Sequence, residues 1–368
     1  MSAIISIGTA VPRHQYRQEE ILGFMQSLYG LDEKETNGLA LMYKRSGIST
    51  RNCIICDYRS APEDRIFYPK TIDFEPAPSI EQRMELYRKE SPLLAQQAID
   101  NSIPKDFDLK TITHLITVSC TGMSAPGLDL QLVQLMDLSP TIHRTSVNFM
   151  GCYAAIHGLK QADYIAKSNP NAVVLVVCVE ICSIHFQKDR DMDNITANLL
   201  FGDGAAAVLV VGDNHKKKWR GKALQINNFY SEVNFSGEKD MAWNISSSGF
   251  LMKLSSYIPS LIELGIIDFV DKALKLNNSN VDDIDFWAIH PGGRKILEMV
   301  SKQLELEKQD LKASYDVLQQ YGNMSSPTIL FVIKQLFDTI SQADKGKLMF
   351  GLAFGPGLTQ ESMVLEVV

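Results

Sequence analysis

Long apolar runs, clustered basic residues and abundant cysteines are what this sequence lacks. The richest apolar run spans residues 172–179 and stops at Glu180, far short of the roughly 20 residues that cross a bilayer. The 36 basic residues are outnumbered by 43 acidic ones, and the one basic run, residues 216–220, is too short to hold a phosphate backbone. We therefore expect neither a membrane span nor a nucleic-acid partner.

The first residues and the six cysteines bear on the compartment. No basic region precedes the first apolar stretch, and Gly8 and Pro12 interrupt it, which predicts no secretory signal and a cytoplasmic protein. Six cysteines in such a chain indicate reduced thiols rather than a disulfide framework. Cys53 and Cys56 form a C-x-x-C pair, but no second pair or spaced histidines follow, so we expect two ordinary thiols and no metal site.

With 45% hydrophobic and 21% charged residues among 368, the composition excludes disordered, collagen-like and coiled-coil chains. Apolar runs of strand length alternate with helical periodicity, which predicts an α/β fold. The expected strands are residues 113–120, 146–150, 172–180, 205–211, 286–289, 347–354 and 362–367, and the expected helices are residues 92–101, 152–168, 294–306 and 326–340.

Two expected helices open in the same way, each shortly after a glycine, Gly151 or Gly322, which suggests that one unit occurs twice. Between residues 214 and 249 the composition turns polar and periodicity disappears, so we place the passage between the halves there, with residues 1–222 and 223–368 as the two halves. Two separate cores are one interpretation. We favour a single duplicated globule, because no linker is long or low in complexity.

Cys152 follows Gly151 where a strand passes into a helix, so the helix N-terminus directs free N–H groups and a positive dipole at the sulfur. This position favours the thiolate, which is the form in which a cysteine acts as a nucleophile. A small buried cysteine fits the same position equally well.

Three further positions are candidates for chemistry. His290 ends an apolar strand before a Pro-Gly-Gly turn, where α/β sheets place binding sites. Asn323 either caps the helix that follows or donates to a substrate oxygen. The Phe354-Gly355-Pro356-Gly357 segment is either a tight hairpin turn or a rigid wall of a cavity.

The motifs GCYAA around Cys152, WAIHPGG around His290, YGNMSS around Asn323 and FGPGLT near the end together resemble the type III polyketide synthases of the chalcone synthase-like family. The resemblance covers essentially the whole chain. It implies a thiolase-like αβαβα fold of two duplicated halves, the first carrying the cysteine and the second the histidine and asparagine. It also implies a homodimer. The implied enzyme uses malonyl-coenzyme A and acyl-coenzyme A as substrates and needs no cofactor.

The resemblance also assigns roles. Cys152 would carry the starter and the growing chain as a thioester, with His290 supporting its thiolate. His290 and Asn323 would hold malonyl-coenzyme A during loss of carbon dioxide, and iteration and cyclisation would give a pyrone, resorcinol or phloroglucinol-type product. The substrate cavity would be lined by Phe201 as gatekeeper and by Cys120, Cys182, His185, Ala197, Met252, Ser325, Phe354, Gly355 and Pro356.

Departures from the family leave the substrates open. Cys120, Cys182, His185 and Ala197 differ from the plant enzymes, and Trp243 falls where a glycine widens the plant cavity. Cys120 is either a small apolar filler or a group that orients the intermediate.

The coenzyme would be met by Lys44, Arg45 and Arg51, while Leu41 occupies one usual basic position, so an acyl carrier protein is an alternative donor of the starter. The competing functions are a single-condensation β-ketoacyl synthase III-like enzyme and a noncatalytic protein that binds acyl thioesters.

Overall fold

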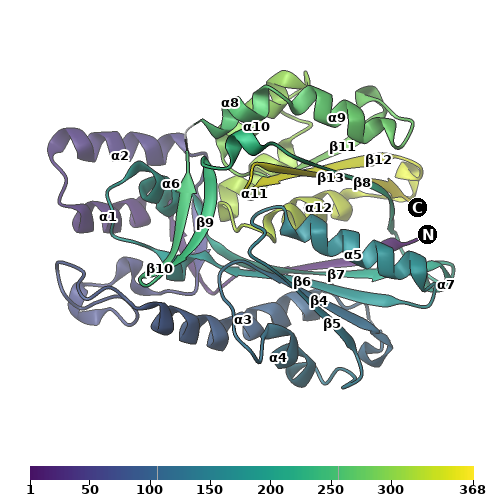
Figure 1. Ribbon diagram of the computed structural model, residues 1–368, viewed down its shortest axis with the longest axis horizontal. Helices are drawn as coiled ribbons and strands as arrows, with labels where there is room; N and C mark the ends of the chain where they lie inside the picture. Colours follow the sequence, from purple (N-terminus) through teal and green to yellow (C-terminus); the bar gives the residue numbers. More distant parts are fainter. Residues whose placement is uncertain (106, 256) are drawn as a thin grey trace.

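The computed structural model describes residues 1–105, 107–255 and 257–368. Helices and sheets alternate in layers: in Figure 1, helices at the top cover one part of a sheet, two helices lie beneath it, and the other part of the sheet and a lower pair of helices follow. This arrangement confirms the expected α/β fold with αβαβα layering.

Nine strands form one mixed sheet in the order β11-β12-β13-β8-β1-β7-β6-β4-β5. Strands β6 and β7 are rich in valine and alanine and are buried along their whole length, because helices cover both of their faces. The strands are β1 (Ala3–Ala10), β4 (His114–Ser119), β5 (His143–Asn148), β6 (Val173–Ile181), β7 (Asp203–Val211), β8 (Leu224–Val233), β11 (Ile284–Ile289), β12 (Leu348–Gly355) and β13 (Thr359–Val367).

The two parts of the sheet repeat one topology. In the first, β1 runs antiparallel to β7, β7 antiparallel to β6, and β6 parallel to β4. In the second, β8, β13, β12 and β11 follow in the same order with the same directions. The parts meet where Ala3 and Ile4 of β1 pair with β8. The chain is therefore the duplicated globule that the sequence favours.

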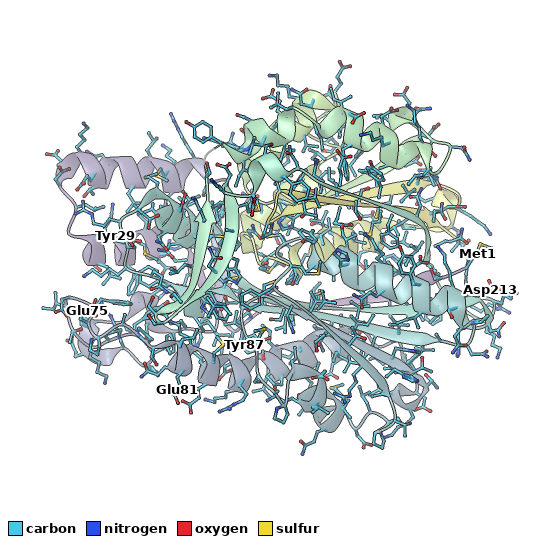
Figure 2. All side chains as sticks on the ribbon, in the orientation of Figure 1. Met1, Tyr29, Glu75, Glu81, Tyr87 and Asp213 are labelled. Atoms are coloured by element: carbon cyan, nitrogen blue, oxygen red, sulfur yellow. The ribbon has the colours of Figure 1, made fainter. Side chains whose placement is uncertain are left out.

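The central layer consists of α5 (Ala154–Ser168) and α12 (Thr328–Thr339), each of which contacts strands of both parts of the sheet. One outer layer contains α3 (Ile80–Ser102) and α4 (Leu128–Leu135), and Tyr87 of α3, labelled in Figure 2, donates a hydrogen bond of 2.7 Å to Ser119 Oγ at the end of β4. The other contains α8 (Ile258–Glu263), α9 (Ile266–Lys275) and α10 (Arg294–Gln303). Among the described residues, no helix has the length and apolar character that crossing a membrane requires.

A group of smaller elements covers one end of the layers, at the left of Figure 1. Helix α1 buries its apolar side in a cluster of aromatic rings, and α2 begins with a capping box in which Asp32 and Glu35 each accept a backbone N–H. This cap contains β2 (His14–Arg17), α1 (Gln18–Tyr29), α2 (Glu33–Arg45), β3 (Thr50–Cys53), α6 (Met192–Leu200), β9 (Met241–Ser246) and β10 (Gly249–Leu254), while α7 (Asp213–Lys216) and α11 (Lys312–Tyr321) lie outside it.

All expected strands and helices are present, with bounds that shift by a few residues. The largest shift is in α3, which begins at Ile80 rather than near residue 92 and carries Pro92 inside it. The segment 214–249 is not irregular: it contains β8 and β9. Strand β8 escapes detection because it is rich in polar residues, which its partly exposed faces tolerate.

We predict that Gly8→Ala lowers the free energy of unfolding by about 1–3 kcal/mol, because overpacking in a core costs that much. A Cβ on Gly8 would lie 2.2 Å from the backbone nitrogen of Ser102, where β1 meets α3. Urea denaturation measures the change. Gly38→Ala is the matched control: its Cβ meets nothing within 4 Å, so this variant is expected to be as stable as the parent or more stable. Equal stability of the two variants would contradict the predicted close packing.

Candidate active site

Cys152 lies in the turn between β5 and α5, two residues before the helix begins. The turn is tight: Phe149 and Gly151 have φ of 59° and 85°, and a Cβ on Gly151 would lie 2.3 Å from Pro356 Cδ. Gly151 is therefore required both by its backbone conformation and by the hairpin loop that packs on it. The loop between β12 and β13 thus fixes the turn that carries Cys152.

Asn323 occupies the corresponding turn before α12, where Gly322 and Ser325 have φ of 69° and 58°. Its amide is oriented by the backbone: Oδ1 accepts the N–H of Ser325 at 2.8 Å, and Nδ2 donates to the carbonyl of Gly292 at 3.3 Å. The same Nδ2 lies 3.9 Å from Cys152 Sγ. The duplicated turns of the two halves therefore bring the thiol and the amide together.

His290 directly follows β11 and is 1% exposed. Its backbone N–H donates to Leu352, but neither ring nitrogen has a hydrogen-bond partner among the described residues. A buried imidazole without partners is costly unless a ligand supplies them. His290 lines the same cavity as Cys152 and Asn323.

Burial keeps both the thiol and the imidazole neutral when each is considered alone. It raises the pKa of Cys152 to about 11, although hydrogen bonds from Ser325 and Asn323 oppose the rise. It lowers the pKa of His290 to about 3. The helix N-terminus therefore does not by itself produce the expected thiolate.

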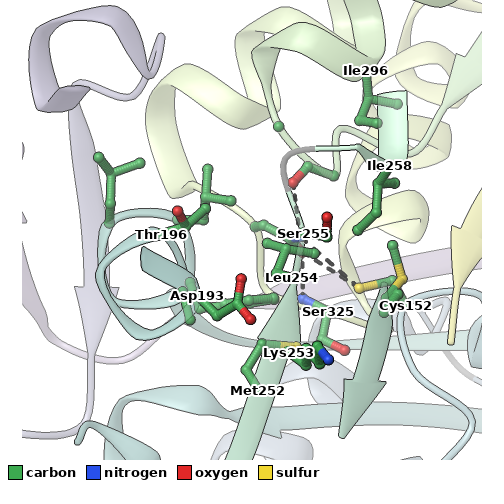
Figure 3. Close-up of a pocket in the computed structure, with 18 of the residues that line it drawn as sticks. Cys152, Asp193, Thr196, Met252, Lys253, Leu254, Ser255, Ile258, Ile296 and Ser325 are labelled. Atoms are coloured by element: carbon green, nitrogen blue, oxygen red, sulfur yellow. Dashed lines mark hydrogen bonds between the residues drawn. The ribbon is translucent and has the colours of Figure 1, made fainter. Parts of the chain in front are cut away.

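The three side chains border a cavity of about 870 Å³. Figure 3 shows Cys152 and Ser325 near residues 252–255 of β10 and the following turn, with Thr196 of α6, Ile258 of α8 and Ile296 of α10 around them. Of the residues expected to line it, Gly355 does not, because it packs behind Cys152 against the ring of Tyr153. The expected residues found in the lining are Phe201, Cys120, Cys182, His185, Ala197, Met252, Ser325, Phe354 and Pro356.

Trp243 and His185 close one side of the cavity. Trp243 of β9 donates through Nε1 to the carbonyl of Cys120 at 2.7 Å, and its ring packs edge-on against His185 with centroids 5.5 Å apart. His185 stacks on Phe250 at 4.2 Å. The Cys120 sulfur accepts the N–H of Gly151 at 3.1 Å, so this thiol touches the turn that carries Cys152.

The three basic residues expected to bind the coenzyme lie in different places relative to the cavity. Arg45 lines the cavity, and Lys44 is exposed beside it without lining it. Arg51 is 3% exposed and donates to Gln18 and to the carbonyls of Asn198 and Phe201, so burial removes it from the mouth and corrects its expected role. Sequence reasoning missed the basic residues that do line the mouth, which are Lys239, Lys253, Arg294 and Lys295.

Glu180, at the end of β6, does not line the cavity but binds residues that lie next to it. Its fully buried carboxyl group accepts hydrogen bonds from Ser326 Oγ at 2.5 Å, Thr121 Oγ1 at 2.8 Å and the backbone of Cys120 at 2.9 Å. Burial raises its pKa to about 7. One carboxyl group therefore ties the end of β4 to the start of α12; its only signal in the sequence is an acidic residue ending an apolar strand.

No group of three or more histidine, cysteine or acidic side chains that could hold a metal ion occurs in the part of the chain that the structure describes. Cys53 is buried, and burial raises the pKa of its thiol. Neither Cys53 nor Cys56 forms a disulfide.

Comparisons with known proteins agree along the whole chain. Residues 1–214 match the model of the chalcone and stilbene synthase N-terminal domain, and residues 229–368 match that of the C-terminal domain. A curated relative, the alpha-pyrone synthesis polyketide synthase-like Pks18 of Mycobacterium tuberculosis, is 30% identical over 100% of this chain and 92% of its own length.

Two solved structures show the same fold. The crystal structure of PKS-I from the brown alga Ectocarpus siliculosus superposes with a TM-score of 0.91 at 29% identity, covering 100% of this chain and 98% of that one. The C-terminal type III polyketide synthase domain of Steely1, a type I/III hybrid from Dictyostelium, gives a TM-score of 0.88 at 30% identity, with 99% of each chain covered. The fold is therefore thiolase-like.

We predict that His185 makes the protein less stable as the pH falls below neutrality. Burial lowers the pKa of His185 to about 3, and the ring is held neutral with Nε2 donating to Thr121 and Nδ1 accepting from Phe250. In the unfolded chain this histidine binds its proton near pH 6.5. Between pH 6.5 and pH 3 the unfolded state therefore holds more protons than the folded state, so the free energy of unfolding decreases as the pH is lowered.

The measurement is the free energy of unfolding of the parent and of His185→Gln across this pH range. The parent is expected to be the more stable protein at pH 7.5, and its advantage is expected to shrink by up to about 1.4 kcal/mol per pH unit below pH 6.5. A difference that stays constant with pH would show that His185 protonates equally in both states.

Proposed function

The chain belongs to the chalcone and stilbene synthase family and is a type III polyketide synthase, and we propose that it extends an acyl-coenzyme A starter by repeated decarboxylative Claisen condensation with malonyl-coenzyme A. The poly-β-keto chain then cyclises to a pyrone, resorcinol or phloroglucinol-type product. The observation that carries the proposal is the convergence of Cys152, His290 and Asn323 at one cavity.

Loading of the starter uses Cys152 as the nucleophile. Its sulfur attacks the thioester carbonyl of the starter, the bond between that carbonyl and the coenzyme sulfur breaks, and coenzyme A leaves as the thiol. His290 takes the proton of Cys152 and returns it to the leaving sulfur, which avoids a separated buried charge. The start of α5 favours negative charge on Cys152 as the proton moves.

Decarboxylation uses two hydrogen-bond donors. The Asn323 amide and an N–H of His290 bind the thioester carbonyl of malonyl-coenzyme A; the bond to the carboxylate breaks, carbon dioxide leaves, and the electron pair forms an enolate. The amide is preorganised by Ser325 and Gly292, and the His290 ring has no competing partner among the described residues. Such donors act most strongly on the charge that develops in the transition state.

Condensation joins the enolate carbon to the carbonyl carbon held on Cys152, and the Cys152 sulfur leaves. The chain, longer by two carbons, is then on coenzyme A and returns to Cys152 for the next round. A cavity of about 870 Å³ is large enough for a growing chain beside the pantetheine arm, within the usual size range of ligand sites.

The charge of the cavity lining favours an anionic acyl donor. The basic residues of the lining outnumber the acidic ones, Asp193 and Asp240; they are Arg45, Lys239, Lys253, Arg294 and Lys295. This charge suits the phosphates of coenzyme A. An acyl carrier protein is the alternative donor for the starter, because a similar domain occurs in a type I/III hybrid.

We also propose a homodimer formed through β5, in the cytoplasm. Strand β5 is at the edge of the sheet; among the described strands it pairs with β4 alone, and it exposes most of its side chains. A long open edge is normally covered by another chain or element. The free cysteines, Cys152 among them, suit a reducing compartment.

We predict that octanoyl-coenzyme A and malonyl-coenzyme A give products of two or more extensions, detected by mass spectrometry. Only single-extension β-ketoacyl products, across a panel of starters, would favour the β-ketoacyl synthase III-like function instead. Binding of acyl-coenzyme A with no turnover at all would favour a noncatalytic acyl-thioester-binding protein.

Two variants separate the steps of that reaction. Cys152→Ala is expected to abolish the acyl-protein adduct seen by intact mass while malonyl-coenzyme A still loses carbon dioxide. Asn323→Asp is expected to keep the adduct and to slow decarboxylation by about 10²–10³-fold, because a carboxylate replaces one donor to the enolate. Retained acylation in Cys152→Ala would remove the proposed nucleophile.

We further predict that Trp243→Ala shifts the products toward longer starters or more extensions. Trp243 fills one side of the cavity between Cys120 and His185, so its truncation opens space beside the acyl chain. Trp243→Phe is the matched control, because it keeps an aromatic ring and removes only the N–H donor. Identical product profiles for the parent and Trp243→Ala would exclude Trp243 as a limit on chain length.

A further inference from the structure

The structure contains a second cavity, of about 520 Å³, that shares no lining residue with the first. One side is a face of α1, where Glu20, Gly23, Phe24 and Ser27 recur at helical spacing. The other side is the segment 58–65 together with Ile72. A Cβ on Gly23 would meet nothing within 4 Å, so the helix is open to the cavity at that point.

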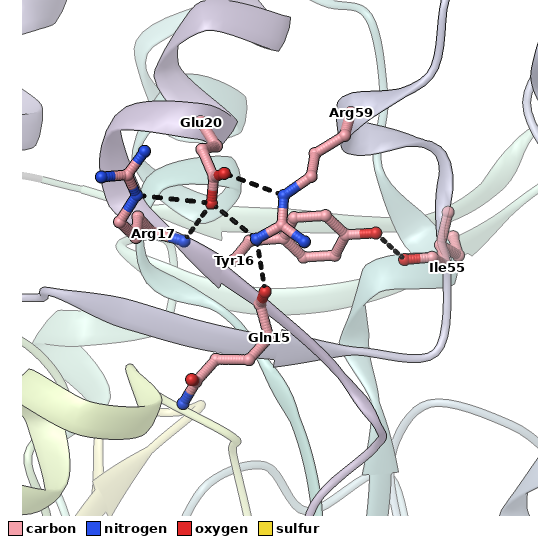
Figure 4. Close-up of polar contacts among 6 residues, drawn as sticks. All are labelled: Gln15, Tyr16, Arg17, Glu20, Ile55 and Arg59. Carbon is pink, nitrogen blue, oxygen red and sulfur yellow. Dashed lines mark hydrogen bonds and ion pairs between the residues drawn. The ribbon is translucent and has the colours of Figure 1, made fainter.

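Two of the three charged side chains that line this cavity neutralise each other. Arg59 donates to both carboxylate oxygens of Glu20 at 2.8 Å, and also to the carbonyl of Gln15 (Figure 4). Its guanidinium carbon lies 4.6 Å from the centre of the Tyr16 ring. These hydrogen bonds from Arg59 lower the pKa of Glu20 to about 2, so the pair stays ionised and leaves no net charge.

The third charged side chain, Arg65, forms no salt bridge with a described carboxylate, although Asp57 and Glu63 lie close enough to favour its charge and its guanidinium carbon lies 5.4 Å from the centre of the Phe24 ring. It is 3% exposed; its Nη1 donates to the carbonyls of Pro69 and Thr71, but among the described residues its Nε has no hydrogen-bond partner. The nearby Asp57 carboxylate accepts the backbone N–H groups of residues 66–68 instead of binding Arg65. A buried cation without a carboxylate partner is costly and favours an anion beside it.

The unpartnered side of this guanidinium and the residues around it indicate which kind of ligand the cavity suits. Nε and Nη2 together form the fork that matches a carboxylate. Phe24 and Tyr58 are buried beside it, and their rings pack at 5.1 Å. Ile72, 84% exposed, lies at the edge of the cavity. A guanidinium group beside apolar and aromatic side chains suits a ligand with one carboxylate and a short apolar group.

We propose that this second cavity binds small monocarboxylates with an apolar or aromatic tail, with the carboxylate on Nε and Nη2 of Arg65 and the tail against Phe24 and Tyr58. The site is separate from the condensation chemistry. It lies behind the wall of the main cavity, since the ring of Phe24 packs at 6.2 Å against that of Phe186, which lines the main cavity.

The test uses 3-phenylpropionate and its uncharged counterpart 3-phenylpropanamide, titrated calorimetrically into the full chain. The parent is expected to bind the carboxylate at least ten-fold more tightly than the amide. Gly23→Leu is expected to weaken carboxylate binding at least ten-fold, because a leucine side chain fills the open space, and to leave polyketide turnover unchanged. Leucine also suits a helix better than glycine, so this variant is expected to fold.

Gly38→Leu is the matched control, since Gly38 is an exposed helical glycine of α2 with equally open surroundings outside the cavity. It is expected to bind the carboxylate as the parent does, whereas Arg65→Met is expected to lose the preference for carboxylate over amide. The proposal is overturned if the parent shows no saturable binding, if Gly23→Leu binds like the parent, or if the amide binds as tightly as the acid. Because turnover is measured separately, loss of binding and loss of the synthase activity are distinguishable.

Discussion

The burial of α5 and α12 between the two parts of the sheet is the constraint on which the active site depends. Each helix contacts strands from both halves, so neither can move without disturbing both sheets. Their N-terminal turns carry Cys152 and Asn323, and both turns use residues with positive φ to direct a side chain into the cavity. The distance between thiol and amide is thus set by core packing rather than by a flexible loop.

Duplication also explains which strand ends face the cavity. Strands β4 and β11 are equivalent in the two halves, and the residues that follow them are Cys120 and His290. The first touches the turn of Cys152, and the second provides the unpartnered imidazole. The same place in the repeat therefore holds a thiol that packs on the Cys152 turn in one half and the proposed catalytic imidazole in the other.

The sequence was sufficient for most of the buried strands and for the helices that open at Cys152 and after Asn323, because apolar strands, glycine turns and helix starts are local signals, but the buried strand β1 was missed. The sequence did not predict elements and side chains whose positions depend on contacts with distant parts of the chain. Strand β8 is polar on its exposed positions and pairs with the last strand of the chain. Lys295, near the start of α10, reaches the mouth only because that helix packs above the cavity. Glu180 gains its role from Ser326, far along the chain.

Arg51 shows how a basic residue near a phosphate site can serve the fold instead. Its Nη1 donates at 2.7 and 2.6 Å to the carbonyls of Asn198 and Phe201, where α6 ends and its backbone carbonyls lack helical partners. Phe201 also bridges to Asn323 through the backbone. These carbonyls hold the Arg51 guanidinium away from the cavity. The same hydrogen bonds fix Phe201, which links the cap to Asn323, so the cap and the central helices are held together around the proposed site.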